Sequence, residues 1–249
     1  MTTSIHVDSR VAASGTGSDF SITLRETAHI HPGARIRVDK VRFIDSFFTT
    51  DLGNHLYYMD GVGGFVVYDL PEQAYTPTRL AAAIQSITGR LTNYSEVTNQ
   101  IHQIVTPGQE ILTDDALKSF SASTFPACAS NSQPMSLNSV LGLPVFEPLA
   151  PELVMFMFPK MSPYDDLYLR SSKLSCQNVH GPFGEHDILC KITLDQGISR
   201  VQSDECPWDV FNDITPTSMK TVDFRLTDYR GKTVNMRGRS LSFQITIDQ

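Results

Sequence analysis

The sequence has few charged residues, no paired cysteines and no long apolar run, and each shortage excludes a class of protein. Only 19% of the 249 residues are charged and the formal net charge is -7, which argues against intrinsic disorder and against a non-specific coat on nucleic acid. The longest apolar run covers residues 153–158, far short of the roughly 20 residues of a membrane-spanning helix. A folded, mildly acidic protein without a membrane-spanning segment is therefore expected.

Cysteine usage points to a reducing compartment. The four cysteines form no CxxC pair, and the opening MTTSIHVDSR contains no apolar signal region. We therefore expect free, mostly buried thiols at Cys128, Cys176, Cys190 and Cys206.

Catalytic and metal-binding spacings are also missing. The sequence has no GxSxG elbow and no His-x-x-x-His pair. The stretch HGPFGEHD, residues 180–187, is the most metal-like, but a polar loop before a strand explains it better. The adjacent acids Asp114 and Asp115 suit the start of a helix, and Asp165 and Asp166 suit a turn that opens a strand. No enzymatic activity, metal or cofactor is therefore expected.

Alternation of apolar and polar residues predicts an all-β protein. The segment 34–45 changes parity, from Ile36 and Val38 to Val41 and Phe43, which predicts a long bent strand. No linker divides the chain, so one domain is expected over residues 1–249. The expected strands are 18–24, 34–45, 55–59, 64–70, 91–97, 100–105, 166–172, 186–194 and a hairpin over 221–248.

The C-terminal segment TVDFRLTDYRGKTVNMRGRSLSFQITID is the clearest strand pattern. Its first arm alternates, Asp228 to Gly231 predict a tight turn, and the second arm changes parity after Gly238. We interpret Gly238 as a bulge or corner, which suits a curved sandwich or barrel.

One helix stands out, in YTPTRLAAAIQSITGR. Thr76 can cap it, Pro77 suits its first position and Gly89 can end it. This short helix is expected to cover an end or edge of the β-structure. Residues 113–120 and 136–143 predict one or two helical turns each, and the proline-rich segment 121–163 predicts an irregular loop excursion.

The C-terminal segment is also basic, although the chain is acidic. Its cations could form a solvated face that blunts a sheet edge. The alternative is that they pair with an acidic face of a neighbouring subunit or with packaged nucleic acid. The candidates are Lys220, Arg225, Arg230, Lys232, Arg237 and Arg239.

Four blocks of the sequence resemble the penton, or minor capsid, proteins of polinton-like elements, virophages and related double-stranded DNA viruses. The blocks are IHVDSRVAASGTGSDFSITL, YTPTRLAAAIQSI, SLNSVLGLP and VDFRLTDYRGKTVNMRGRSLSFQITI, in the same order along the chain. The resemblance implies a single jelly-roll β-sandwich. It also implies a homopentamer at the vertex of an icosahedral virion, beside a larger double jelly-roll major capsid protein and made inside the host cell.

A fivefold ring needs two different patches that meet between neighbours. The basic segment is one candidate patch, and acids in early loops, Asp8, Asp19, Asp51 and Asp60, are candidates for the other. The main alternative is a jelly-roll module that binds a receptor or carbohydrate. A single tryptophan, Trp208, gives sugar stacking little support. A hydrolase using loop carboxylates is the least favoured alternative.

Overall fold

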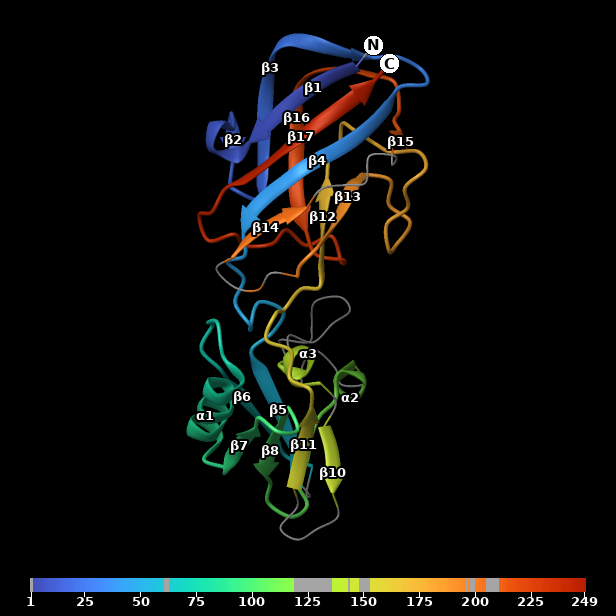
Figure 1. Cartoon of the computed structure of the whole chain (residues 1–249). Coiled ribbons are helices and arrows are strands. Elements are labelled where there is room, and N and C mark those ends of the chain that lie inside the picture. Colours follow the sequence, from blue (N-terminus) through green and yellow to red (C-terminus); the bar gives the residue numbers. More distant parts are fainter. Residues whose placement is uncertain are drawn as a thin grey trace. The chain divides into compact units, whose positions relative to one another are not determined.

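The computed structural model describes residues 2–60, 63–118, 136–142, 144–147, 153–195, 197, 200–204 and 211–249. The sequence predicts one domain, whereas the chain forms two compact units (Figure 1). Unit 1 comprises Met1–Phe47 and Tyr164–Gln249, and unit 2 comprises Phe48–Pro163. The chain leaves unit 1 at Phe47 and returns at Tyr164, and these two rings pack edge to face with centroids 5.0 Å apart. Unit 2 is therefore an insertion between two residues of unit 1 that are in contact, which sequence composition does not reveal.

The part of unit 1 that the structure describes forms two antiparallel sheets. The order of strands in the first is β1 (Thr2–Asp8), β17 (Leu241–Asp248), β4 (Arg35–Ile44) and β14 (Val201–Asp204), with β15 (Asn212–Asp213) also paired to β4. The order in the second is β13 (Ile188–Thr193), β12 (Asp166–Arg170), β16 (Thr217–Thr227), β3 (Asp19–Ile30) and β2 (Ser14–Gly15). A short 3-10 helix, η1 (Ser9–Val11), follows β1.

The strand order of unit 1 is that of a jelly roll. Eight of the strands alternate between the two sheets along the chain, except that β12 and β13 are neighbours in one sheet. In chain order these strands are β1, β3, β4, β12, β13, β14, β16 and β17. This order places the first and last strands side by side in the same sheet. Each of the two packed sheets contains four of these eight strands, as in a jelly roll. The predicted all-β jelly-roll fold is confirmed.

Aromatic rings from both sheets fill the core of unit 1. Phe224 on β16 packs edge to face against Phe243 on β17, with centroids 5.0 Å apart, and contacts Phe20 on β3 at 5.8 Å. All three side chains are buried. Because Phe224 and Phe243 come from opposite sheets, their contact joins the two layers of the sandwich.

The C-terminal segment is not a hairpin, so that prediction is wrong. β16 lies between β12 and β3 in one sheet, and β17 lies between β1 and β4 in the other. The tight turn forms nonetheless: the Gly231 N–H donates to the Asp228 carbonyl over 3.1 Å, and Thr227 forms a bridge with Thr233. Val234 N still donates to the Leu226 carbonyl over 3.0 Å, and beyond this bond the chain leaves the sheet that contains β16.

The change of parity at Gly238 marks a change of sheet. Val234 and Met236 are buried as the chain crosses between the sheets, and Gly238 adopts a φ of 75° before β17 begins. An alternating pattern identifies a strand and its dry face, but it does not identify the partner strand.

Strand β4 is bent, as its parity predicts. Ser242 and Gln244 of β17 face Arg42 and Asp39 of β4, so β4 has two residues where β17 has one. Lys40 takes a positive φ of 53° at this bulge. The bulge moves the buried apolar positions from Ile36 and Val38 to Val41 and Phe43.

The described residues of unit 2 form two small antiparallel sheets and three helices. One sheet has the order β10 (Pro144–Glu147), β11 (Leu153–Met157), β8 (Gln100–Ile104), β7 (Thr92–Ser95), and the other has the order β6 (Phe65–Asp69), β5 (His55–Met59), β9 (Glu110–Ile111). The helices are α1 (Pro77–Thr88), α2 (Asp114–Lys118) and α3 (Asn138–Leu141). Part of the predicted 121–163 excursion is therefore regular, namely α3, β10 and β11, and 121–135 lie outside the described residues.

Helix α1 begins and ends where the sequence predicts. The Thr76 hydroxyl accepts a hydrogen bond from Arg79 N over 3.3 Å, and Gly89 ends the helix with a φ of 68°. Leu80 and Ile84 are buried in the core of unit 2. The helix packs beside β7.

The polar residues of the block SLNSVLGLP, residues 136–144, form hydrogen bonds within unit 2. The Asn138 amide donates to the Leu112 carbonyl over 2.8 Å and to the Asp114 carboxylate over 3.0 Å. The Ser136 hydroxyl also bonds to the Asp114 carboxylate. These bonds attach the segment before and within α3 to the start of α2, so Asp114 serves as an anchor.

Candidate interaction surfaces

The basic residues of the C-terminal segment are not equally available to a partner. Arg225 donates to Asp187 over 3.1 Å, Arg237 donates to the Ser46 carbonyl over 3.1 Å, and the Arg230 guanidinium lies 5.0 Å from the ring of Tyr229. Their cationic groups already have contacts within unit 1.

Two cations of the segment 228–240 remain available. Lys232 and Arg239 are exposed, and neither side chain has an ion pair or hydrogen bond with any described residue. Lys220 is similarly exposed, but it lies in the middle of β16. Lys232 and Arg239 are therefore the clearest candidates for contact with a partner.

The four acidic candidates do not form one patch. Asp8 is paired with Arg10 at 2.5 Å, and hydrogen bonding to that side chain lowers the pKa of the Asp8 carboxyl. Asp51 and Asp60 belong to unit 2, where they accept the backbone N–H groups of Phe48 and Gly64 at 3.0 and 2.6 Å.

Asp19 is exposed and lies close to the basic segment. It faces Arg225 across the β3–β16 pair. The backbone of the nearby Gly17 lies against that of Arg239. A Cβ atom added to Gly17 would stand only 2.1 Å from the Arg239 carbonyl oxygen. Asp19 and Arg239 therefore belong to the same corner of unit 1, not to two opposite patches.

Arg170 on β12 is a buried, charged residue that sequence patterns do not reveal. Its side chain is only 3% exposed. It donates to the Thr227 hydroxyl over 2.9 Å, to Asp187 over 2.7 Å and to Glu185 over 3.2 Å. Alternation places this arginine on the wet face of its strand, but the later loop 180–187 and the turn at Gly231 lie against its side chain.

Asp187 joins two arginines that would otherwise repel each other. Arg170 and Arg225 are directly opposite on neighbouring strands, and like charges in that position are destabilising. One oxygen of Asp187 accepts from Arg170 and the other from Arg225. The metal-like stretch 180–187 thus supplies carboxylates to arginines.

The same loop holds an exposed phenylalanine in a fixed turn. Gly184 N donates to the Gly181 carbonyl over 3.0 Å, and Phe183 N donates to the Glu185 carboxylate over 2.9 Å. Burial raises the pKa of Glu185, but hydrogen bonds from two backbone N–H groups and from Arg170 outweigh it, so the pKa is lowered. Phe183 is 70% exposed at the tip.

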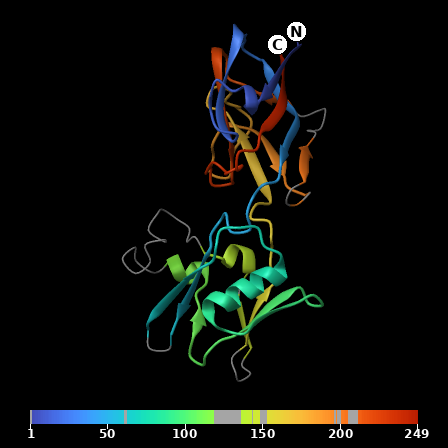
Figure 2. The ribbon, with the colours of Figure 1, turned by 90° about the vertical axis from the view of Figure 1, so that its left-hand side faces the viewer.

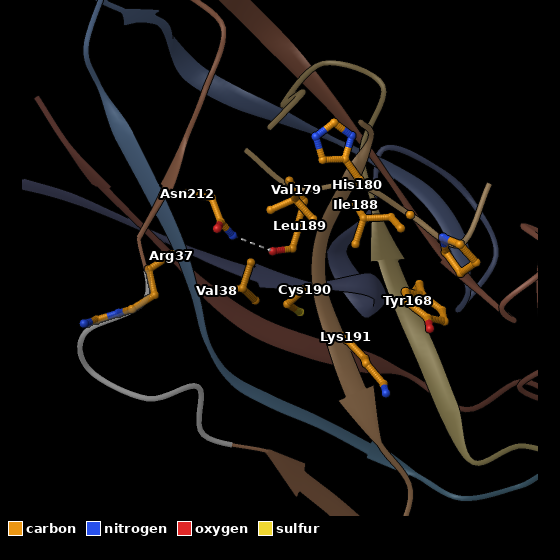
Figure 3. Close-up of a pocket in the computed structure, with 12 residues that line it drawn as sticks. Arg37, Val38, Tyr168, Val179, His180, Ile188, Leu189, Cys190, Lys191 and Asn212 are labelled. Atoms are coloured by element: carbon orange, nitrogen blue, oxygen red, sulfur yellow. Dashed lines mark hydrogen bonds between the residues drawn. The ribbon is translucent and has the colours of Figure 1, made fainter. Parts of the chain in front are cut away.

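A cavity of about 560 Å³ opens beside β13 (Figure 3). Val38 and Leu189 form part of its wall, and Cys190, His180 and Lys191 also line it. Asn212 donates to the Leu189 carbonyl across one side over 3.4 Å. Lys191 is paired with Asp166 at 2.8 Å, which raises the pKa of Lys191. Asp166 is thus occupied by an ion pair.

The described residues show no constellation with evident chemistry. They contain no group of three or more His, Cys, Asp or Glu that could hold a metal ion. Cys176 is fully buried, and burial raises its pKa to about 11. Cys128, Cys206 and Trp208 lie outside the described residues. Within the described ranges, no helix has the length and hydropathy to cross a bilayer.

Unit 1 defines a jelly-roll β-sandwich of the class found in viral capsid proteins and lectins. Neither a protein-family model nor a curated protein matches the sequence. Among solved structures, the chain is similar to the selenomethionine-labelled mavirus penton protein, with 9% identity, a TM-score of 0.47 and coverage of 100% of this chain and 98% of that chain. The assignment of the fold rests on the strand order of unit 1, not on this alignment.

Proposed function

We propose that this chain is a structural capsid protein that self-associates into five-membered rings at the vertices of an icosahedral shell. The observation that carries the proposal is the jelly-roll strand order of unit 1. Jelly rolls also occur in lectins, so the fold does not by itself decide the function. The resemblance of the four sequence blocks adds support, because they lie in both units: at β1–β3, α1, α3 and β16–β17.

The proposed mechanism is a heterologous contact repeated around a fivefold axis. One patch of each subunit meets a different patch of the next, and the ring closes when the rotation is correct. Lys232 and Arg239 supply the cationic side, since they are exposed and have no described partner. Asp8 and Asp19 lie on strands next to Arg239, so the acidic side falls to Asp51 and Asp60 in unit 2. Buried apolar surface supplies most of the association free energy, and the charges set the register.

The partners follow from this role. A larger double jelly-roll major capsid protein would surround the ring, and packaged DNA is a second candidate for the basic residues. The major capsid protein comes from the sequence resemblance, and the DNA comes from the basic charge of the C-terminal segment.

The first test is the mass of the purified chain in solution. We expect light scattering across concentration to give a pentamer, with five-membered rings in negative-stain images. A trimer that binds glycans would refute the proposal in favour of the recognition module. A monomer at every concentration, unchanged in the presence of an authentic double jelly-roll partner, would also refute it.

A charge-reversal pair tests the patch. Arg239→Glu should weaken ring formation at least tenfold while leaving the thermal unfolding of the monomer unchanged. Lys220→Glu is the matched control, because it makes the same change in net charge at an exposed cation that has no ion pair with any described residue. Equal effects of the two variants would assign the result to net charge and remove Arg239 from the interface.

A further inference from the structure

Strand β7 is an open sheet edge beside a helix. It is the last strand of the order β10-β11-β8-β7, and α1 packs next to it (Figures 1 and 2). A cavity of about 530 Å³ lies between the two elements. Ala82 and Ser86 of α1 and Gly89 just after the helix line one side, and Thr92 and Tyr94 of β7 line the other.

The hydrogen-bonding groups of β7 alternate between two sides. The Leu91 carbonyl accepts from Ile104 N over 3.0 Å, and Asn93 faces His102 of β8. In an antiparallel pair the N–H and C=O of one residue point to the same side, and successive residues alternate. The main-chain groups of Thr92 and Tyr94 therefore point away from β8, toward the cavity.

One of these outward groups is already occupied by a side chain of α1. The Gln85 amide oxygen accepts the Thr92 N–H over 3.1 Å, in the position that a carbonyl of an added strand would take. The Thr92 carbonyl and the N–H and carbonyl of Tyr94 are left for a partner: no loop, turn or cap among the described residues bonds to them. Along the edge, a partner would therefore meet an acceptor, the Thr92 carbonyl, then a donor, the Tyr94 N–H, and then a second acceptor, the Tyr94 carbonyl.

The helical wall leaves room for side chains. Leu80 and Ile84 hold α1 in the core of unit 2, while the opposite flank presents Ala82 and Ser86 to solvent. Small residues at these positions allow an extended chain to lie against the helix with alternate side chains under it. The lining is uncharged, which favours uncharged side chains in the occupant.

We propose that β7 and α1 form a strand-addition site for an extended segment of another protein chain. The segment pairs antiparallel with β7, bonds to the main chain of Thr92 and Tyr94, and displaces the Gln85 amide. The side chains that it turns toward α1 are small or medium-sized and uncharged. The proposal does not depend on the capsid role, since it uses only groups within unit 2.

The probe is a phage library of random heptapeptides selected on the full-length chain, with Tyr94→Pro as the counter-selection target. Tyr94→Pro removes an N–H that points away from β8, so the β7–β8 ladder stays intact. We expect enriched peptides whose synthetic forms shift the ¹⁵N resonances of residues 92–95 and of α1. N-methylation of the peptide at alternate residues should weaken binding at least tenfold, because it removes the main-chain donors and keeps the side chains.

Three further variants separate strand addition from other binding. Tyr94→Phe keeps the main-chain N–H and loses only the hydroxyl bond to Asn99, so it should bind normally. Gln85→Ala should bind at least as tightly as the native chain. Ala82→Phe fills the exposed groove without entering the core and should abolish binding, a readout that holds even if Tyr94→Pro does not fold. Peptides that bind Ala82→Phe equally well, that tolerate N-methylation, or that shift residues elsewhere would overturn the proposal, as would a library with no enrichment.

Discussion

Replacing Asp187 by asparagine should destabilise unit 1 more than any other single loss of a charge on its surface. Asp187 accepts from Arg170 at 2.7 Å and from Arg225 at 3.1 Å, and Arg170 is only 3% exposed. Removing one partner of a buried ion pair costs about 3 to 5 kcal/mol, because a charge is left buried and uncompensated.

The expected cost for Asp187→Asn is smaller, for two reasons. The Asp187 side chain is 25% exposed, and Glu185 still accepts from Arg170 at 3.2 Å. We therefore expect the free energy of unfolding to fall by about 2 to 3 kcal/mol. The measurement is urea denaturation followed by circular dichroism. We expect the midpoint urea concentration to fall and the dependence of the free energy of unfolding on urea concentration to stay unchanged.

A matched control and a second-site change make this prediction specific. Among the described residues, the Asp223 carboxylate bonds to Ser172 alone, at 2.9 and 2.8 Å. Asp223→Asn should therefore cost less than about 1 kcal/mol. Replacing Arg225 by methionine in the Asp187→Asn background should recover part of the loss, because the cation facing Arg170 is removed. If Asp187→Asn costs no more than the control, the bridge between the two arginines does not stabilise the fold.

Three further predictions follow from burial and charge. Phe243→Ala, in the joint between the two sheets, should lower the free energy of unfolding by about 3 to 5 kcal/mol, and a loss under about 1 kcal/mol in the same urea assay would contradict the assignment of faces. The pKa of Glu185 is lowered in the folded chain, so the ionised carboxylate stabilises the fold above its unfolded pKa of about 4.3, and this stabilisation is lost as pH falls below that value. Glu185→Gln should therefore lose less stability between pH 5 and 3 than the native chain. Identical pH profiles of the two proteins would refute this. Burial raises the pKa of Cys176 to about 11 and leaves it no exposure, so mass spectrometry after iodoacetamide treatment at pH 8 should show Cys190 alkylated at least tenfold faster, and equal rates would contradict the buried position.

Local patterns predict the elements of this chain well where the physical signal is local. The ends of α1 follow from a capping threonine and a glycine able to adopt positive φ, and the bulge in β4 follows from its parity change, because each depends on neighbours in sequence. Short strands such as β9 and β14 carry too few residues to show a pattern. The candidate surfaces were predictable only as sets of charged residues. Which of them are already paired, as Arg225 is with Asp187, depends on a loop far away in the sequence.

The amino-acid sequence by itself determined that this protein is built mainly from strands, where helix α1 begins and ends, and which faces of the strands are dry. The tertiary structure alone decided that the last two strands belong to different sheets, that residues 48–163 form an inserted unit, and that Arg170 is buried. The physical reason is that periodicity records the environment on each side of a strand, whereas strand partners and loop cover are set by contacts between distant residues.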